Sequence, residues 1–204
     1  MSDIGAVFPM FYLPPVEYFT RLNQHKQNIL IDKHEHLVKQ TYRNRAHIYS
    51  PDGMLALTVP VIRGSKVHTH VKDVKISYDF KWQRLHWMSL QACYRRSAYF
   101  EYYEDDFARF YEDKFDYLFD FNEQLLRMVL GFIKLKTDLH FTEEYLPTHP
   151  GLTDYRASFS AKKETGFEQQ KTYFQVFEER KGFIPNLSIA DLLFNQGPQS
   201  INYL

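Results

Sequence analysis

The amino-acid sequence predicts an α/β domain in which a mixed β-sheet is flanked by helices. Near the amino terminus, an apolar stretch at 6–10, a short amphipathic stretch at 16–23 and a second apolar stretch at 28–31 follow one another. Strand, helix and strand in this order are typical of a parallel unit. Further along, two apolar stretches at 46–49 and 54–61 are separated by residues suited to a turn. Together these patterns favour a sheet with helices packed on it.

The remaining elements follow from hydrophobic spacing. The run Ile29-Leu30-Ile31 is continuously apolar, which is typical of a parallel strand buried on both faces, so we expect it inside the sheet. Apolar residues at helical spacing predict a helix that begins at the cap residue Asp79, and two more at 100–111 and 115–133. The helix at 115–133 should pack on a face of the sheet. Short strands are expected at 74–77, 139–141 and 173–177, and Ser188 should begin a last helix that ends before Gly197-Pro198.

Length and composition limit the classes of protein. The 204 residues suffice for one domain with a substantial core, and 25 basic residues balance 25 acidic ones. This balance gives no electrostatic argument for binding nucleic acid or an anionic membrane. Cys93 is the single cysteine, which excludes an intrachain disulfide and suits a reducing compartment. With neither a signal peptide nor a span-length apolar run, we expect a cytoplasmic protein.

One long stretch shows little periodicity. Residues 142–172 are polar and contain prolines and glycines, and they predict a long mobile loop within a domain that covers 1–204. We expect the part at 154–171 to have low order without ligand, to be cleaved by protease at Lys162-Lys163, and to close over the site.

The candidate site follows the buried strand at 28–31. In open α/β sheets, ligands bind at the carboxyl ends of strands. Directly after this strand come Asp32, His34, Glu35 and His36. Since the unperturbed pKa of histidine is near neutral, His36 is the candidate general base, and Asp32 or Glu35 is the group that orients it. The predicted catalytic residues are therefore His36, Asp32 and Glu35.

Two arginines offer an anion site. In an extended segment, Arg43 and Arg45 point to the same face with Asn44 opposite, and guanidinium groups match phosphate or carboxylate oxygens in pairs. We expect Arg43, Arg45 and His36 to face one pocket. The alternative, with comparable weight, is that the arginines pair with acidic neighbours or loop carbonyls.

Other patterns have plainer interpretations. His34 and His36, like His68 and His70, alternate in a way that can bind metal, but no third-ligand spacing supports a metal site and none is predicted. Cys93 lies beside arginines that would activate a thiol, yet cysteines within helices are more often buried hydrophobic residues. The aromatic and acidic stretch at 99–121 could hold a sugar, but its spacing favours ordinary amphipathic helices. No phosphate loop or dinucleotide fingerprint is present, and no particular cofactor is indicated.

Several stretches in a fixed order resemble the WbqC-like family. They are Phe8-Pro9-Met10-Phe11-Tyr12-Leu13-Pro14 with Tyr18-Phe19, Tyr42-Arg43-Asn44-Arg45, Leu57-Thr58-Val59-Pro60-Val61, the strand at 74–77 with Trp82 and His86, and Asn186-Leu187-Ser188-Ile189-Ala190-Asp191-Leu192-Leu193-Phe194-Asn195. The resemblance covers nearly the whole chain. Phe8 and Glu17 depart from the family pattern, and its usual glycine-rich stretch is not recognisable in 150–172.

The resemblance implies a setting in O-antigen or polysaccharide biosynthesis. Family members are similar to proteins of O-antigen gene clusters, for which transfer of glycine has been suggested, so it implies a transferase that moves an aminoacyl group to a sugar or glycan precursor. The substrate would carry phosphate or carboxylate, as a nucleotide sugar does. The predicted substrate-binding residues are Tyr12, Tyr42, Arg43, Asn44, Arg45 and His86. The alternative is a non-catalytic module that binds an anionic ligand or an acidic segment of a protein partner.

Overall fold

The computed structural model describes residues 5–26, 28–38, 40–62, 69–160, 167 and 170–204. The helices and strands follow along the chain in the order β1 (Ala6–Pro9), α1 (Val16–Gln24), β2 (Ile29–Asp32), β3 (Arg45–Ser50), β4 (Gly53–Thr58), η1 (Val71–Asp73), α2 (Trp82–Tyr94), α3 (Phe100–Glu112), α4 (Leu118–Phe132), β5 (Leu139–Phe141), β6 (Thr153–Asp154), α5 (Glu178–Lys181), α6 (Ile189–Gln196) and η2 (Gly197–Tyr203).

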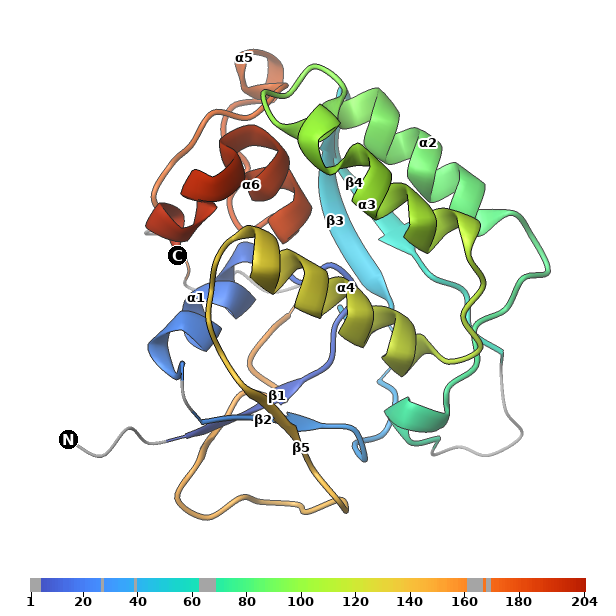
Figure 1. The fold of residues 1–204 in the computed structure, drawn as a ribbon, viewed down its shortest axis with the longest axis vertical. Helices are drawn as coiled ribbons and strands as arrows, with labels where there is room; N and C mark the ends of the chain where they lie inside the picture. The colour runs from blue at the N-terminus through green and yellow to red at the C-terminus, as the bar shows by residue number, and fades with distance from the viewer. Residues whose placement is uncertain (1–4, 27, 39, 63–68, 161–166, 168–169) are drawn as a thin grey trace.

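A parallel sheet of four strands forms the base of the fold in Figure 1. The strand order is β5-β2-β1-β6, and each neighbouring pair is parallel. The strand β2 lies between β5 and β1, and α1 connects β1 to β2. The predictions of an interior strand and of a strand–helix–strand unit at the amino terminus are therefore confirmed.

The strands β3 and β4 form an antiparallel hairpin in a second, two-stranded sheet. The hairpin turns through Pro51-Asp52, and Gly53 follows with φ +109°, which a residue with a side chain rarely adopts. Parallel and antiparallel pairing thus occur together with flanking helices, and the α/β class is confirmed.

The helix α4 packs on the parallel sheet and also contacts the segment that precedes β3. The Phe119 ring lies 5.8 Å from Phe141 of β5, as expected for a helix on a sheet face. One turn further on, the Asn122 side chain donates a 2.8 Å hydrogen bond to the carbonyl of Arg43, just before β3. In Figure 1, α4 runs diagonally between the parallel sheet and the helices α2 and α3.

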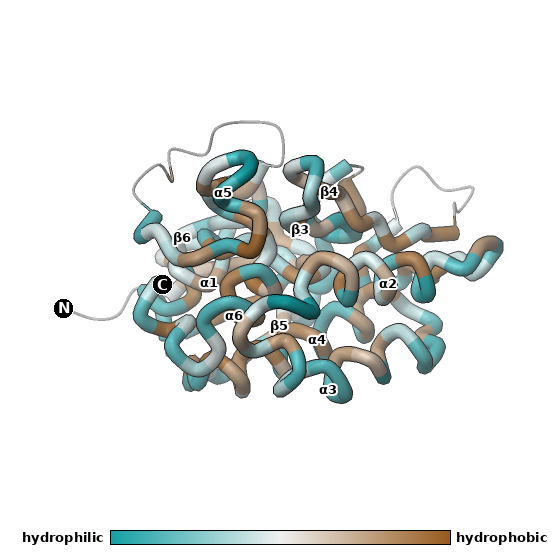
Figure 2. Tube along the Cα trace, turned by 90° about the horizontal axis from the view of Figure 1, so that it is seen from above, coloured by the Kyte–Doolittle hydropathy of each residue, from teal (hydrophilic) through white to brown (hydrophobic). Residues whose placement is uncertain are grey.

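The core is rich in aromatic rings because α2, α3 and α6 all present them inward. Phe194 of α6 lies 5.0 Å from both Phe100 and Phe107 of α3. Along α3, hydrophilic and hydrophobic stretches alternate (Figure 2), as expected of a helix with one buried face. The acidic and aromatic residues of this helix are therefore explained by packing.

Three local predictions were wrong. The α2 helix begins at Trp82, and the Asp79 carboxylate accepts a hydrogen bond from Ser77 instead of capping the helix. Residues 74–77 make isolated bridges only, at Lys75 and Ile76.

The predicted strand at 173–177 pairs with no neighbouring strand in the described chain. Its alternation is real, since Tyr173 and Gln175 are buried while Phe174 is 54% exposed. The buried side chains instead donate to the carboxylate of Asp191, at 2.7 Å and 2.9 Å. Burial raises the pKa of Asp191 to about 6, although hydrogen bonds from its tyrosine and glutamine partners act in the opposite direction.

The described part of the stretch 142–172 follows a definite path. It contains β6, which adds to the edge of β1, and Phe159 is buried 5.5 Å from Phe11 and 5.3 Å from Tyr18. That this stretch is mobile, and that it belongs to one domain with the rest of the chain, remain predictions. Lys162 and Lys163, where cleavage was predicted, lie outside the described residues.

Candidate functional site

The carboxyl ends of the parallel strands meet at one edge of the sheet, as parallel pairing requires. Asp32 is the last residue of β2, Thr142 directly follows β5, and Arg156 comes two positions after the end of β6. The backbone continues the pairing beyond the strands, because Thr142 donates its N–H to Ile31 at 3.0 Å. Three residues far apart in sequence are thereby brought together.

Asp32 is the centre of this edge. Its side chain is fully buried, and a buried carboxylate must be hydrogen-bonded or paired. One oxygen accepts from the backbone N–H groups of His34 and Glu35, at 2.9 Å and 3.0 Å, and from the Thr142 hydroxyl at 3.1 Å. The other oxygen accepts from Arg156 at 2.8 Å. Asp32 therefore fixes the turn that follows β2.

Arg156 ties three segments of the chain together. Besides Asp32, its guanidinium donates to both oxygens of Asp154 and to the carbonyls of Leu146 and Pro147, at 2.8 Å and 2.9 Å. The hydrogen bonds with Asp154, followed by those with Asp32, outweigh burial and raise the pKa of Arg156. Burial alone would raise the pKa of Asp154, but its hydrogen bonds with Arg156 outweigh that effect and lower it.

Glu35 and Arg43 form a second buried pair beside the first. The Arg43 Nε donates to one carboxylate oxygen of Glu35 at 2.8 Å, and a terminal nitrogen donates to the other. Both side chains are at most 7% exposed. Burial raises the pKa of Glu35, and the opposing effect of Arg43 does not cancel it. Arg43 also donates to the carbonyl of Arg156 at 3.2 Å, which links the two pairs into one ionic network.

The predicted clamp of two arginines is not formed. Tyr42 and Arg43 lie in a turn, so the segment is not extended and its side chains do not alternate as they would in a strand. Arg43 is occupied by Glu35, while Arg45 Nε donates to the Thr58 hydroxyl at 3.2 Å. Arg43 therefore follows the alternative prediction, in which the arginines pair with acidic neighbours within the protein. Asn44 likewise serves structure, since its amide donates to the carbonyl of Val59 at 2.9 Å.

Histidine rings gather just beyond Asp32. The rings of His36 and His70 stack with centroids 4.8 Å apart, and His34 lies 5.9 Å from His70. Nδ1 of His70 is hydrogen-bonded to the carbonyl of His34. Because a carbonyl oxygen only accepts, this Nδ1 carries the hydrogen, and the neutral His70 ring has its lone pair on Nε2.

The surroundings of the histidines are positively charged. Burial, followed by the charges of Lys72, Lys33 and His70, lowers the pKa of His34. Asp32 acts in the opposite direction and is outweighed. His68, the other member of the second alternating pair, lies outside the described residues. Among the residues that the structure describes, no group of three or more His, Cys, Asp or Glu side chains is arranged to hold a metal ion.

Tyr12 and His86 belong to a separate buried group. The Tyr12 hydroxyl is 3.1 Å from Nδ1 of His86 and 2.9 Å from the hydroxyl of Tyr111. Burial lowers the pKa of His86 to about 4, so the ring is neutral near pH 7. Tyr42 is buried as well, with its ring 5.7 Å from Phe11. These three predicted substrate-binding residues therefore lie in the core, and their polar and ring contacts are with core residues.

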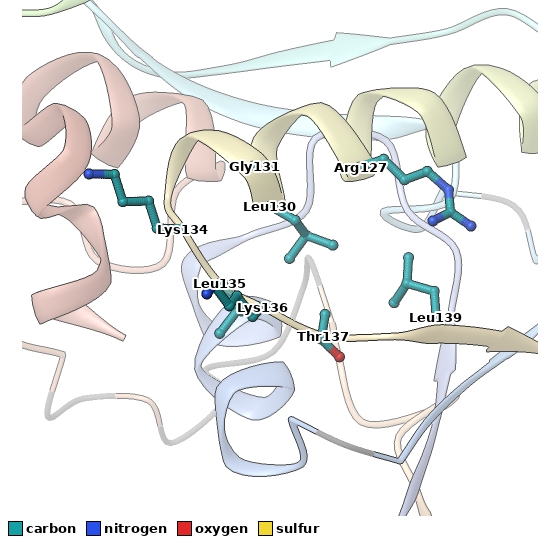
Figure 3. Close-up of a pocket in the computed structure, with 8 residues that line it drawn as sticks. All are labelled: Arg127, Leu130, Gly131, Lys134, Leu135, Lys136, Thr137 and Leu139. Atoms are coloured by element: carbon teal, nitrogen blue, oxygen red, sulfur yellow. The ribbon is translucent and has the colours of Figure 1, made fainter.

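Two other features lack the properties of a reaction site. Cys93 is buried and burial raises its pKa to about 11, which opposes a nucleophilic role. A surface hollow of about 400 Å³ lies between the end of α4 and the start of β5 (Figure 3). Leu130 and Leu139 point into it, whereas Lys134 points away. Because it borders the beginning of β5, it lies away from the carboxyl ends of the strands.

Four residues of this edge were missed by the sequence analysis: Thr142, Asp154, Arg156 and Tyr145, whose ring centroid lies 5.7 Å from that of His36. All lie in the aperiodic stretch at 142–172, where no local pattern distinguishes them from neighbouring polar and aromatic residues. For Asp154 and Arg156 a signal would have required knowing that β6 pairs with β1. Thr142 directly follows the predicted strand at 139–141 and could have been found by the same carboxyl-end rule as Asp32.

Comparison with known proteins agrees with the motifs of the sequence. The model of the WbqC-like protein family matches residues 10–160, which include the whole ionic network. The chain belongs to the WbqC-like protein family. It is 27% identical to the uncharacterized protein Rv1507c of Mycobacterium tuberculosis, over 98% of this chain and 96% of that protein. No solved structure matches the chain. No helix in the described part of the chain is long and apolar enough to cross a membrane.

Proposed function

We propose that this WbqC-like protein is a group transferase that moves an aminoacyl group, such as glycyl, to a sugar or glycan precursor at the carboxyl edge of the parallel sheet. The observation that carries the proposal is the stack of histidine rings beside a buried, fully hydrogen-bonded Asp32. The ionic network holds the turn after β2 rigid, and a rigid support is what a reacting group requires.

The histidines supply the acid and base chemistry. Asp32 accepts four hydrogen bonds and Glu35 is held by Arg43 from two nitrogens, so both carboxylates are occupied as supports. His36 is the proposed general base, and His70, whose Nδ1 bond leaves the lone pair on Nε2, is a second group able to take the proton. In the transfer, an acceptor hydroxyl attacks the aminoacyl carbonyl, the bond to the leaving group breaks, and the hydroxyl proton passes to the imidazole.

The anionic part of the substrate fits the positive surroundings of His34. Lys33 and Lys72 lie side by side, since the Lys72 backbone N–H donates to the carbonyl of Lys33 at 3.2 Å, and their charges favour a phosphate or carboxylate near His34. Lys72 also pairs with the exposed Asp73 at 3.0 Å. This rim replaces the two-arginine clamp as the proposed anion site. Asp32, Glu35 and Arg43 remain in the proposal as residues that position the site.

A reaction with defined donors tests the transferase. The protein is incubated with glycyl thioesters and glycyl esters together with a panel of amino sugars and nucleotide sugars, and mass spectrometry detects the glycylated acceptor. The variants are His36→Gln and His70→Gln. We expect the variant that lacks the general base to react at least a hundredfold more slowly, since general-base catalysis contributes a factor on the order of 10²–10⁴ to the rate. The conservative control is His140→Gln, because His140 is an exposed residue of β5. Full activity of both variants would refute the assignment of the base.

A binding module without catalysis is the second candidate. The observation in its favour is that both carboxylates of the site are fully engaged by protein donors, so the positive rim could hold an anion without reacting. Calorimetry with phosphate and carboxylate ligands, combined with the absence of any transfer product, would support this candidate over the transferase.

A further inference from the structure

A partly exposed aromatic ring borders the histidine stack. The side chain of Tyr145 is 44% exposed, and its ring centroid lies 5.7 Å from that of His36. The planes of the two rings are inclined by 39°, so the rings lie tilted against one another. Leu146, the next residue, is 39% exposed. An apolar surface is thus presented directly beside the proposed base.

The Tyr145 ring contacts the guanidinium of Arg156. The guanidinium carbon of Arg156 lies 5.8 Å from the centre of the Tyr145 ring, within the range of a cation–π contact. The position of this guanidinium is in turn fixed by its hydrogen bonds to buried Asp32 and to the carbonyls of Leu146 and Pro147. Tyr145 therefore contacts a guanidinium of fixed position through its ring, and the carbonyl of the next residue binds the same guanidinium.

We propose that Tyr145 is a stacking platform for a sugar ring whose phosphate group lies at the positive rim around His34. This inference rests on the proposed function and names the substrate class of the same site. Binding sites for small molecules combine apolar and aromatic walls with a few placed polar groups. The Tyr145 ring beside the histidine stack, with Lys33 and Lys72 side by side near His34, has this composition. The apolar face of a sugar ring fits an aromatic ring, and its phosphate fits the cations.

The test is calorimetric binding of a panel of hexose 1-phosphates, with inorganic phosphate and uridine diphosphate as comparison probes. We expect Tyr145→Ala to weaken binding of the hexose 1-phosphate about tenfold and to leave binding of inorganic phosphate unchanged, since a tenfold change corresponds to about 1.4 kcal/mol, which is within the range for an aromatic stacking contact. Tyr145→Phe keeps the ring and should bind within about twofold of the native protein. Thermal unfolding of each variant checks that it folds.

The matched control is Tyr102→Ala, because Tyr102 is a 79% exposed tyrosine on α3 whose ring contact is with Tyr99. It should not change binding. The inference is overturned if Tyr145→Ala binds the sugar phosphates as well as the native protein, if no hexose 1-phosphate binds, or if uridine diphosphate shows the same tenfold loss, which would mean stacking of a base. Binding can be measured without turnover, so the two proposals fail separately. If the affinity depends on Tyr145 but no transfer is detected, the transferase is refuted and the stacking platform stands. If transfer is detected but the affinity does not depend on Tyr145, the platform is refuted and the transferase stands.

Discussion

Replacing Arg156 by Met should destabilise the protein through the carboxylate that it leaves behind. Asp32 is fully buried, and its ion pair with Arg156 has an N–O distance of 2.8 Å. Removing one partner of a buried pair typically costs about 3–5 kcal/mol, because the remaining charge stays buried without compensation. Asp32 keeps three neutral donors, so we expect about 2–4 kcal/mol. For a chain of this length that corresponds to roughly 5–15 °C in the unfolding temperature.

Urea and thermal unfolding measure this effect, and Arg127→Met is the matched control. Arg127 makes a 2.8 Å ion pair with Glu123 on the exposed side of α4, and such pairs contribute about 0.3–0.5 kcal/mol. Combining Arg156→Met with Asp32→Asn should recover part of the loss, because the uncompensated charge is then absent. If Arg156→Met is no more harmful than Arg127→Met, the ion pair with Asp32 does not support the turn after β2, and the reasoning fails.

Three further outcomes are expected. Burial holds the pKa of His86 at about 4, below its ordinary 6.5. The contribution of the neutral ring to stability is therefore present above pH 6.5 and is lost as the pH falls towards 4. Urea unfolding at several pH values should show this loss in the native protein, and the loss should be absent in His86→Phe. Gly197→Ala should unfold at clearly lower temperature, because φ is +54° and a Cβ would lie 2.5 Å from the Tyr99 ring, whereas Gly131→Ala in α4 meets nothing within 4 Å and should be neutral or stabilising. Cys93 should react slowly with thiol reagents at pH 8 and rapidly once the chain is unfolded in urea; equal rates would contradict its raised pKa.

Sequence patterns predicted those parts of the fold that depend on neighbouring residues. The continuous run at 29–31 indicated an interior strand, and Pro51-Asp52-Gly53 indicated the turn between β3 and β4, because burial and turn geometry act locally. The alternation at 173–177 was misleading for a physical reason. Alternating burial shows that a chain is extended, but the buried groups there bind the side chain of Asp191 and not a neighbouring strand.

That the site lies at the carboxyl edge of the sheet remains a prediction, whereas several of the contacts expected there differ in the structure. Asp32 and the histidines after it lie at the carboxyl edge, as the general rule for α/β sheets implies. That Arg43 would be occupied by Glu35 could not be read from spacing, since it depends on a turn at Tyr42 and Arg43. Arg156 was out of reach because β6 has two residues and no periodicity of its own.

The pairing of β6 with β1 has a consequence for how the chain folds. Ala6 pairs with Thr153, so this strand pair closes a loop that contains most of the chain, and long-range parallel pairing is slow to form. Until β6 docks, the edge of β1 has unpaired backbone groups and Asp32 lacks its cation, although the βαβ unit at the amino terminus is already complete in sequence. Intermediates of this kind expose an open strand edge and are prone to associate with one another. During synthesis, a ribosome-bound chain that has not yet released residue 156 should therefore be the species most in need of a chaperone.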